Sequence, residues 1–184
     1  MPITTLDAKT ALILVDLQKG IVGMPLAHPV ADILGNARQL ADAFRTAGLP
    51  VVLVNVTGGA PGRVEQARSL AGRPADWADL VPELGQQSTD HTVTKRTWGA
   101  FTGTDLAGYL VSQGTTQVVI GGISTSIGVE STARQAYELG FNVAIALDAT
   151  TDMNVDAYTN SVTRIFPRLG ETSTTLQILD LMVA

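Results

Sequence analysis

The 184-residue sequence contains no cysteine, which removes several kinds of chemistry at once. Disulfide bonds, thiolate metal sites and a cysteine nucleophile are all excluded. No apolar run approaches the ~18 residues that a membrane-spanning helix needs. The first residues, MPITTLDAKT, lack the basic and apolar pattern of a signal peptide. We therefore expect a cytoplasmic protein that does not contact membranes.

Basic residues are also scarce. Lys and Arg number 12 against 17 Asp and Glu, which gives a formal net charge of −5. The basic residues form no cluster, so we expect no nucleic-acid partner. Hydrophobic residues make up 45% of the chain, enough for a sizeable core, and we expect one domain over residues 1–184.

Apolar runs alternate with segments of helical spacing. Runs such as TALILV at 10–15 and PVVLVNV at 50–56 are typical of strands buried on both faces of a parallel sheet. The expected strands are 10–15, 50–56, 91–95, 118–120, 141–147 and 172–175. The expected helices are 29–48, 106–113, 155–166 and 176–182, with one more that contains Glu130 and Arg134. This alternation predicts an α/β fold, three-layered and doubly wound around a mainly parallel sheet.

The stretch QVVIGGISTSIGVESTAR, residues 117–134, combines a buried strand, a turn of small residues and a helix. Such a turn leaves backbone N–H groups free at a helix N-terminus, which carries a partial positive charge. Ser124, Thr125 and Ser126 are candidates for the N-cap of that helix. Gly128 is expected to face the pocket, where it offers no side chain.

Two charged residues follow predicted strands. Asp16 comes after the strand at 10–15, and Lys95 ends the strand at 91–95. Open α/β sheets bind ligands at the carboxyl ends of their strands, which favours a site here. If the two side chains meet, each stabilises the charged form of the other. The alternatives are that Asp16 caps a turn or forms a structural ion pair, and that Lys95 is a surface cation.

Four further residues are candidates for contact with a substrate. Gln18 either lies at the pocket rim or orients Asp16. Trp98 and Phe101 either wall a pocket or pack in the core or at a subunit contact. Arg63 lies in the segment 57–87, which we expect to be a partly helical lid or an interface. It either reaches an anionic substrate or belongs to a solvated surface.

Three separated motifs resemble the isochorismatase-like hydrolases, also called the cysteine hydrolase superfamily. They are LILVDLQKGIV at 12–22, TKRTWGAFTGTDL at 94–106 and VVIGGISTSIGVESTARQAYELGFNVAIALDA at 118–149. The resemblance implies a doubly wound α/β fold, a homo-oligomer (dimer or tetramer) and a catalytic Asp, Lys and Cys. Asp16 and Lys95 match the first two.

The resemblance also implies a cis peptide bond between Ile123 and Ser124. Backbone N–H groups near that bond would form an oxyanion hole. Ile123, Ser124 and Thr125 are therefore candidates for substrate binding.

The sequence departs from this family in two places. Gly128 stands where the nucleophilic Cys is expected, so thiolate attack and an acyl-enzyme are impossible. The segment 55–59 lacks the His of the family's metal site, so we expect no metal and no other cofactor. Asn55 stands near the place where isochorismatases carry a Gln, and it is a weaker candidate for substrate binding.

A glycine at this position resembles the true isochorismatases, which hydrolyse a vinyl ether without a nucleophilic side chain. In that reading Asp16 is a general acid whose pKa is raised by burial, and Lys95 holds a substrate carboxylate. Two alternatives stay open. The chain is either a non-catalytic binding or assembly protein, or an amide hydrolase in which Asp16 activates water.

Overall fold

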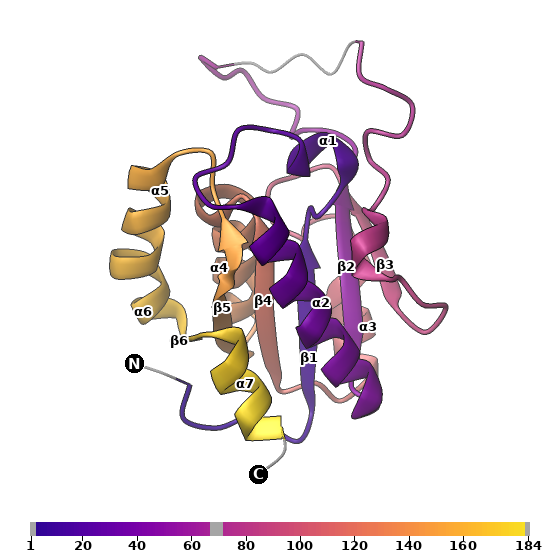
Figure 1. The fold of residues 1–184 in the computed structure, drawn as a ribbon, viewed down its shortest axis with the longest axis vertical. Coiled ribbons are helices and arrows are strands. Elements are labelled where there is room, and N and C mark those ends of the chain that lie inside the picture. The colour runs from indigo at the N-terminus through magenta and orange to yellow at the C-terminus, as the bar shows by residue number, and fades with distance from the viewer. Residues whose placement is uncertain (1–2, 67–71, 183–184) are drawn as a thin grey trace.

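The computed structural model describes residues 3–66 and 72–182. Six parallel strands form one sheet in the order β3-β2-β1-β4-β5-β6, which confirms the predicted α/β fold. Their bounds are β1 Thr10–Val15, β2 Val51–Val56, β3 His91–Lys95, β4 Gln117–Ile123, β5 Asn142–Thr151 and β6 Glu171–Ser173. The chain starts in the middle of the sheet and winds outward to both sides, as Figure 1 shows.

Helices cover both faces of the sheet (Figure 1). The α-helices are α1 Lys19–Val22, α2 Val30–Thr46, α3 Leu106–Ser112, α4 Glu130–Glu138, α5 Val155–Asn160, α6 Phe166–Leu169 and α7 Thr175–Met182. Leu12 and Leu14 belong to one core cluster with side chains of α2 and α7. Ile13 and Val15 belong to a second cluster with side chains of α3, α4 and α6. Alternate residues of a strand point to opposite faces, so β1 contributes side chains to the core on each side of the sheet.

Several element boundaries differ from the prediction by a few residues, and two differences change the architecture near the site. β5 was expected to end at Leu147, but it continues to Thr151 because its pairing with β4 shifts register between Ile120 and Gly122. The expected helix 155–166 is interrupted by the π-helical turn η3, Ser161–Ile165. Pro167 lies in the first turn of α6, where a missing N–H breaks no helical bond.

The described residues of the segment 57–87 contain one short 3₁₀ turn, η1 Pro82–Leu84. Its second half packs against the turn that follows β1. Gln18 pairs with Leu80, and the Lys19 Nζ lies 3.0 Å from an Asp76 carboxylate oxygen. Arg68, which also falls in this segment, lies outside the described residues. A role as lid or interface stays a prediction.

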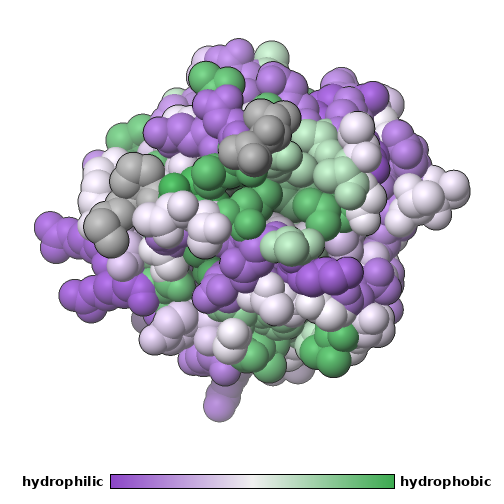
Figure 2. Space-filling model, turned by 90° about the horizontal axis from the view of Figure 1, so that it is seen from below, coloured by the Kyte–Doolittle hydropathy of each residue, from purple (hydrophilic) through white to green (hydrophobic). Residues whose placement is uncertain are grey.

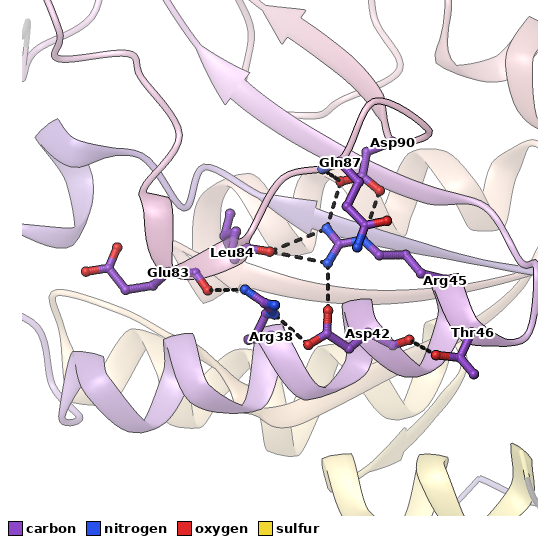
Figure 3. Close-up of polar contacts among 8 residues, drawn as sticks. All are labelled: Arg38, Asp42, Arg45, Thr46, Glu83, Leu84, Gln87 and Asp90. Atoms are coloured by element: carbon purple, nitrogen blue, oxygen red, sulfur yellow. Dashed lines mark hydrogen bonds and ion pairs between the residues drawn. The ribbon is translucent and has the colours of Figure 1, made fainter.

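A buried ion pair ties the end of α2 to the chain before β3 (Figure 3). The guanidinium of Arg45 donates from Nε to Asp90 Oδ1 at 3.0 Å and from Nη2 to Asp90 Oδ2 at 2.7 Å. Gln87 N donates to the same Oδ2 at 2.8 Å, and Arg45 also binds Asp42 and the Leu84 carbonyl. Both oxygens of Asp90 are therefore occupied.

Partly buried side chains that include Leu49, Leu179 and Met182 pack against the first core cluster. Figure 2 looks onto the side where both termini lie, and green apolar side chains gather there. In the part of the chain that the structure describes, no helix combines the length and apolarity that crossing a membrane requires.

Candidate functional site

Asp16 and Lys95 meet at the carboxyl edge of the sheet. Lys95 ends β3, and its long side chain reaches past the end of β2 to Asp16, the residue after β1. Lys95 Nζ donates to Asp16 Oδ2 at 2.7 Å and to the Thr97 carbonyl at 3.2 Å. The two residues are only 5% and 2% exposed. The pair is thus shielded from water. Electrostatic interactions in such a buried environment are stronger than in water.

The second carboxylate oxygen of Asp16 is left without a partner. Asp16 Oδ1 is buried and makes no hydrogen bond to any described residue. Burial raises the pKa of Asp16 from 3.8 to about 6, although the nearby Lys95 ammonium lowers it. A buried acceptor without a partner is costly, so Oδ1 is an atom that a proton or a ligand would satisfy.

Gly128 completes the group of three predicted residues. It lies in the π-helical turn η2, Thr125–Val129, which continues directly into α4. A Cβ built at Gly128 would lie 3.2 Å from Asp16 Oδ2 and 3.0 Å from Val15 Cγ1. The glycine therefore faces the carboxylate and keeps the space beside it clear of a side chain.

The turn before Gly128 contains a cis peptide bond between Ile123 and Ser124, where the resemblance implied one. Ser124 occupies the N-cap position, but its hydroxyl makes no capping bond. The Thr125 hydroxyl lies 2.8 Å from that of Thr150 in β5, so this residue is tied to the sheet.

Asp152, which the sequence analysis missed, holds the same turn. Its carboxylate Oδ2 accepts from Ser126 N at 2.7 Å and from Ser126 Oγ at 2.8 Å, and its Oδ1 accepts from Asn154 N at 3.2 Å. Burial by itself would raise its pKa, but the donated hydrogen bonds outweigh burial and lower it. A carboxylate after a buried strand was the available signal. The apolar run predicts a strand that ends at Leu147 and is followed by Asp148, so Asp152 lies beyond the predicted strand.

Two polar candidates are engaged with the backbone. Gln18 Oε1 accepts from Val56 N at 2.7 Å, and its Nε2 donates to the carbonyls of Val56 and Trp77. This side chain joins the turn after β1 to the end of β2 and to the segment around Trp77. Asn55 Nδ2 donates to the Ala78 carbonyl at 2.9 Å, while its buried Oδ1 has no partner among the described residues.

The remaining candidates lie apart from one another. Phe101 is buried and stacks on Phe141 at 6.2 Å between ring centroids, so it packs in the second core cluster. Trp98, in contrast, is 64% exposed. Arg63 is exposed in the segment after β2. The structure therefore brings neither the tryptophan nor the arginine into the buried group around Asp16.

A cavity of about 670 Å³, open to solvent, does not coincide with this group. Its lining includes Asn36 of α2, Asp148 of β5, Tyr158 of α5 and His28, which precedes α2. Because Asp16 does not line it, we define the site by its side-chain chemistry rather than by cavity size. Within residues 3–66 and 72–182, no three His, Asp or Glu side chains gather as a metal ion would require.

Comparisons with known proteins agree on one family. Residues 10–177 match the family described as "Isochorismatase domain". The chain is 43% identical over 179 residues to the uncharacterized isochorismatase family protein YwoC of Bacillus subtilis, covering 94% of this chain and 93% of that protein. The structure of an isochorismatase family protein from Burkholderia thailandensis superposes with a TM-score of 0.94 at 38% identity, over 98% of each chain. Nicotinamidase 3 of Arabidopsis thaliana is 30% identical over 156 residues, 80% of this chain and 76% of that protein.

Proposed function

The chain belongs to the isochorismatase family of hydrolases, and we propose that it hydrolyses a vinyl ether in a small anionic substrate of the isochorismate type. The reaction uses Asp16 as a general acid and forms no covalent intermediate. The observation that carries this proposal is the buried Asp16 Oδ1, which has no partner in the described chain and belongs to a carboxyl whose pKa is raised to about 6.

The raised pKa gives Asp16 a usable proton. At pH 7 a carboxyl with a pKa of about 6 is protonated in roughly a tenth of the molecules, about a hundredfold more than at the ordinary value. Catalytic acids work best when their pKa lies near the working pH. Lys95 occupies Oδ2, so Oδ1 is the oxygen that carries the proton.

The proton moves from Asp16 Oδ1 to the terminal vinyl carbon, and the ether oxygen stabilises the resulting oxocarbenium ion. Water adds to the cationic carbon and returns a proton to the carboxylate. The hemiketal then breaks into a keto acid and an alcohol. Lys95 has a third N–H that its two hydrogen bonds leave for a substrate carboxylate. Gly128 carries no side chain beside Asp16, where even a Cβ would lie only 3.0 Å from Val15 Cγ1 and 3.2 Å from Asp16 Oδ2.

The environment of the turn supports a cationic transition state over an anionic one. Acyl transfer needs backbone N–H groups aimed at a developing oxyanion. Here the Ser126 N–H donates to the Asp152 carboxylate. That carboxylate also offsets the positive end of the helix. Both features weaken the stabilisation of a negative charge at this turn.

Amide hydrolysis is the second candidate, because the matching relatives include a protein named nicotinamidase. In that reaction Asp16 would act as a base that activates water. The two candidates make opposite demands on the protonation of Asp16, since an acid must start protonated and a base must start ionised.

The test is release of pyruvate from isochorismate by the wild type and by Asp16→Ala, measured from pH 5 to 9. We expect release that the variant lacks, with a rate that falls as the pH rises above about 6. If no pyruvate is released at saturating isochorismate, isochorismate is excluded as the substrate. A panel of amides would follow, and a rate that falls as the pH drops below about 6 would favour the base mechanism. A lack of activity on every compound of the panel would favour a non-catalytic binding protein.

A further inference from the structure

We propose that Asp152 is a positioning residue, which holds the turn Ser124–Gly128 against Asp16 and thereby sets the rate of the reaction. This rests on the proposed function for its effect on rate. Its structural half, the restraint of the turn, can be measured without any substrate.

Asp152 joins segments that are separate in the sequence. Its carboxylate accepts from the backbone and the hydroxyl of Ser126 and from the backbone of Asn154 before α5. Its own carbonyl accepts from Ala27 N, in the link between α1 and α2, at 2.8 Å. The residue is only 2% exposed. One buried side chain thus connects the end of β5 to the start of the turn.

The turn is restrained by hydrogen bonds at two residues, Ser126 and Gly128. Ser126 is bound to Asp152. The Thr132 hydroxyl donates to the Gly128 carbonyl at 2.7 Å. Because a Cβ at Gly128 would lie 3.2 Å from Asp16 Oδ2, a shift of the turn would change the surroundings of the Asp16 carboxyl. A misplacement of about 1 Å can reduce a rate about 100-fold.

A carboxylate suits this position better than a neutral group. η2 and α4 form one continuous helical stretch, and Asp152 lies at its N-terminal end, where negative charge is favourable. Bonds from N–H and O–H groups to an ionised oxygen are shorter and stronger than neutral ones. An Asn side chain has only one acceptor oxygen, so it cannot keep all three bonds.

The experiment compares Asp152→Asn, Asp152→Ala and Ser126→Ala with a matched control, Asp156→Asn. Asp156 is an exposed carboxylate four positions away in the first turn of α5, so its loss changes net charge equally. Amide hydrogen exchange, followed by NMR, measures directly how well the Ser126 amide in the turn is protected. We expect protection of the Ser126 amide to fall about 10-fold in Asp152→Ala and less in Asp152→Asn. The control and Ser126→Ala, which keeps the backbone bond, should change it little.

Steady-state kinetics measure how the loss of this restraint changes kcat and KM. We expect kcat for pyruvate release from isochorismate to fall about 10- to 100-fold in Asp152→Ala and less in Ser126→Ala, with KM within about twofold. The pH at which the rate begins to fall should stay at its wild-type value, because Asp16 sets it. A residue that only supports the fold would change thermal stability without this split between kcat and KM.

The outcomes separate the two proposals. If the wild type releases no pyruvate but the Ser126 amide loses protection in Asp152→Ala, the proposed substrate fails and the restraint stands. If pyruvate is released and kcat is unchanged in every Asp152 variant, the positioning role is overturned. A rise in KM that matches the loss in kcat/KM would overturn it as well, because it would assign Asp152 to substrate binding. Should Asp152→Ala not fold, Asp152→Asn and Ser126→Ala still decide.

Discussion

Two buried ion pairs lie at opposite edges of this sheet, and they are built differently. At the amino edge, Arg45 binds Asp90 through two parallel bonds, and both carboxylate oxygens have partners. At the carboxyl edge, Lys95 binds one oxygen of Asp16, and the other has no partner in the described chain. The Asp90 side chain is 1% exposed and the Asp16 side chain 6%. Burial alone does not distinguish them.

The difference lies in how completely each carboxylate is satisfied. A planar guanidinium matches both oxygens of a carboxylate, whereas an ammonium is a point charge that engages one. The first pair connects α2 to the chain before β3 and is suited to stability. The second leaves a carboxyl with a raised pKa and an open acceptor, which is typical of a functional site. We therefore expect substitution of Asp16 to act mainly on activity and substitution of Asp90 to act mainly on stability.

Asp16→Asn should give the largest effect on activity. General acids contribute about 10²- to 10⁴-fold to a rate, so we expect kcat to fall within that range. The amide oxygen still accepts from Lys95, but the buried ammonium loses its negative partner, so we also expect a lower urea midpoint. Asp32→Asn, an exposed residue in the first turn of α2, is the control. A variant that keeps its rate would remove Asp16 from catalysis.

Asp90→Ala should give the largest effect on stability. It leaves the largely buried Arg45 guanidinium without its bidentate partner, which costs about 3–5 kcal/mol for a broken buried pair. We expect this loss in urea denaturation, with kcat unchanged in the fraction that stays folded. Glu83→Ala also removes one negative charge nearby, but Glu83 takes part only through its carbonyl, as Figure 3 shows. Equal losses in the two variants would mean that the pair contributes nothing specific.

Lys95→Met should raise the pKa of Asp16 further above its value of about 6. Desolvation raises this pKa and Lys95 opposes it, so removal of the ammonium leaves desolvation unopposed. The measurement is the pH titration of the Asp16 carboxyl carbon by NMR, which needs no activity. Lys9→Met, at an exposed position, is the control. A lower midpoint in Lys95→Met would contradict the proposed balance.

Gly128→Ala should give the smallest effect on stability. Alanine favours a helix by about 1 kcal/mol over glycine, but its Cβ would crowd Val15 and Asp16 at 3.0 and 3.2 Å. We expect these terms to offset each other while kcat falls, because the methyl group enters the space beside Asp16. Gly108→Ala in α3 meets no atom within 4 Å and should stabilise without loss of activity. Unchanged kcat in Gly128→Ala would show that this space is not used.

Much of the architecture could be predicted because the strands have a clear pattern of apolar residues in the sequence. β1 and β3 have the predicted bounds, since continuous or alternating apolar residues leave few other structures for these segments. The meeting of Asp16 with Lys95 follows from topology. Parallel strands end at one edge, and residues after them lie close together even when 79 positions separate them in the chain.

The end of β5 could not be predicted in the same way. Asp148 interrupts the apolar run and resembles a strand end, yet its Oδ1 accepts from the backbone and hydroxyl of Thr175 at 2.7 and 2.9 Å. That partner lies 27 residues further along the chain. The strand continues because the register shift beside Gly122 fits the extra residues, and Asp152 follows it to the turn. Nothing local in the sequence distinguishes the two aspartates.

The sequence by itself determined the order of strands and helices, the absence of a cysteine nucleophile and the choice of Asp16, Lys95 and Gly128 as a group. These depend on residue type and on periodicity, which are local. Only the tertiary structure decided which carboxylate is satisfied and which is not. It paired Asp90 with Arg45, gave Asp152 to the turn and left Asp16 Oδ1 open. Hydrogen-bond partners and desolvation depend on distant segments that meet only in the folded chain, and they decide which buried charge is available for chemistry.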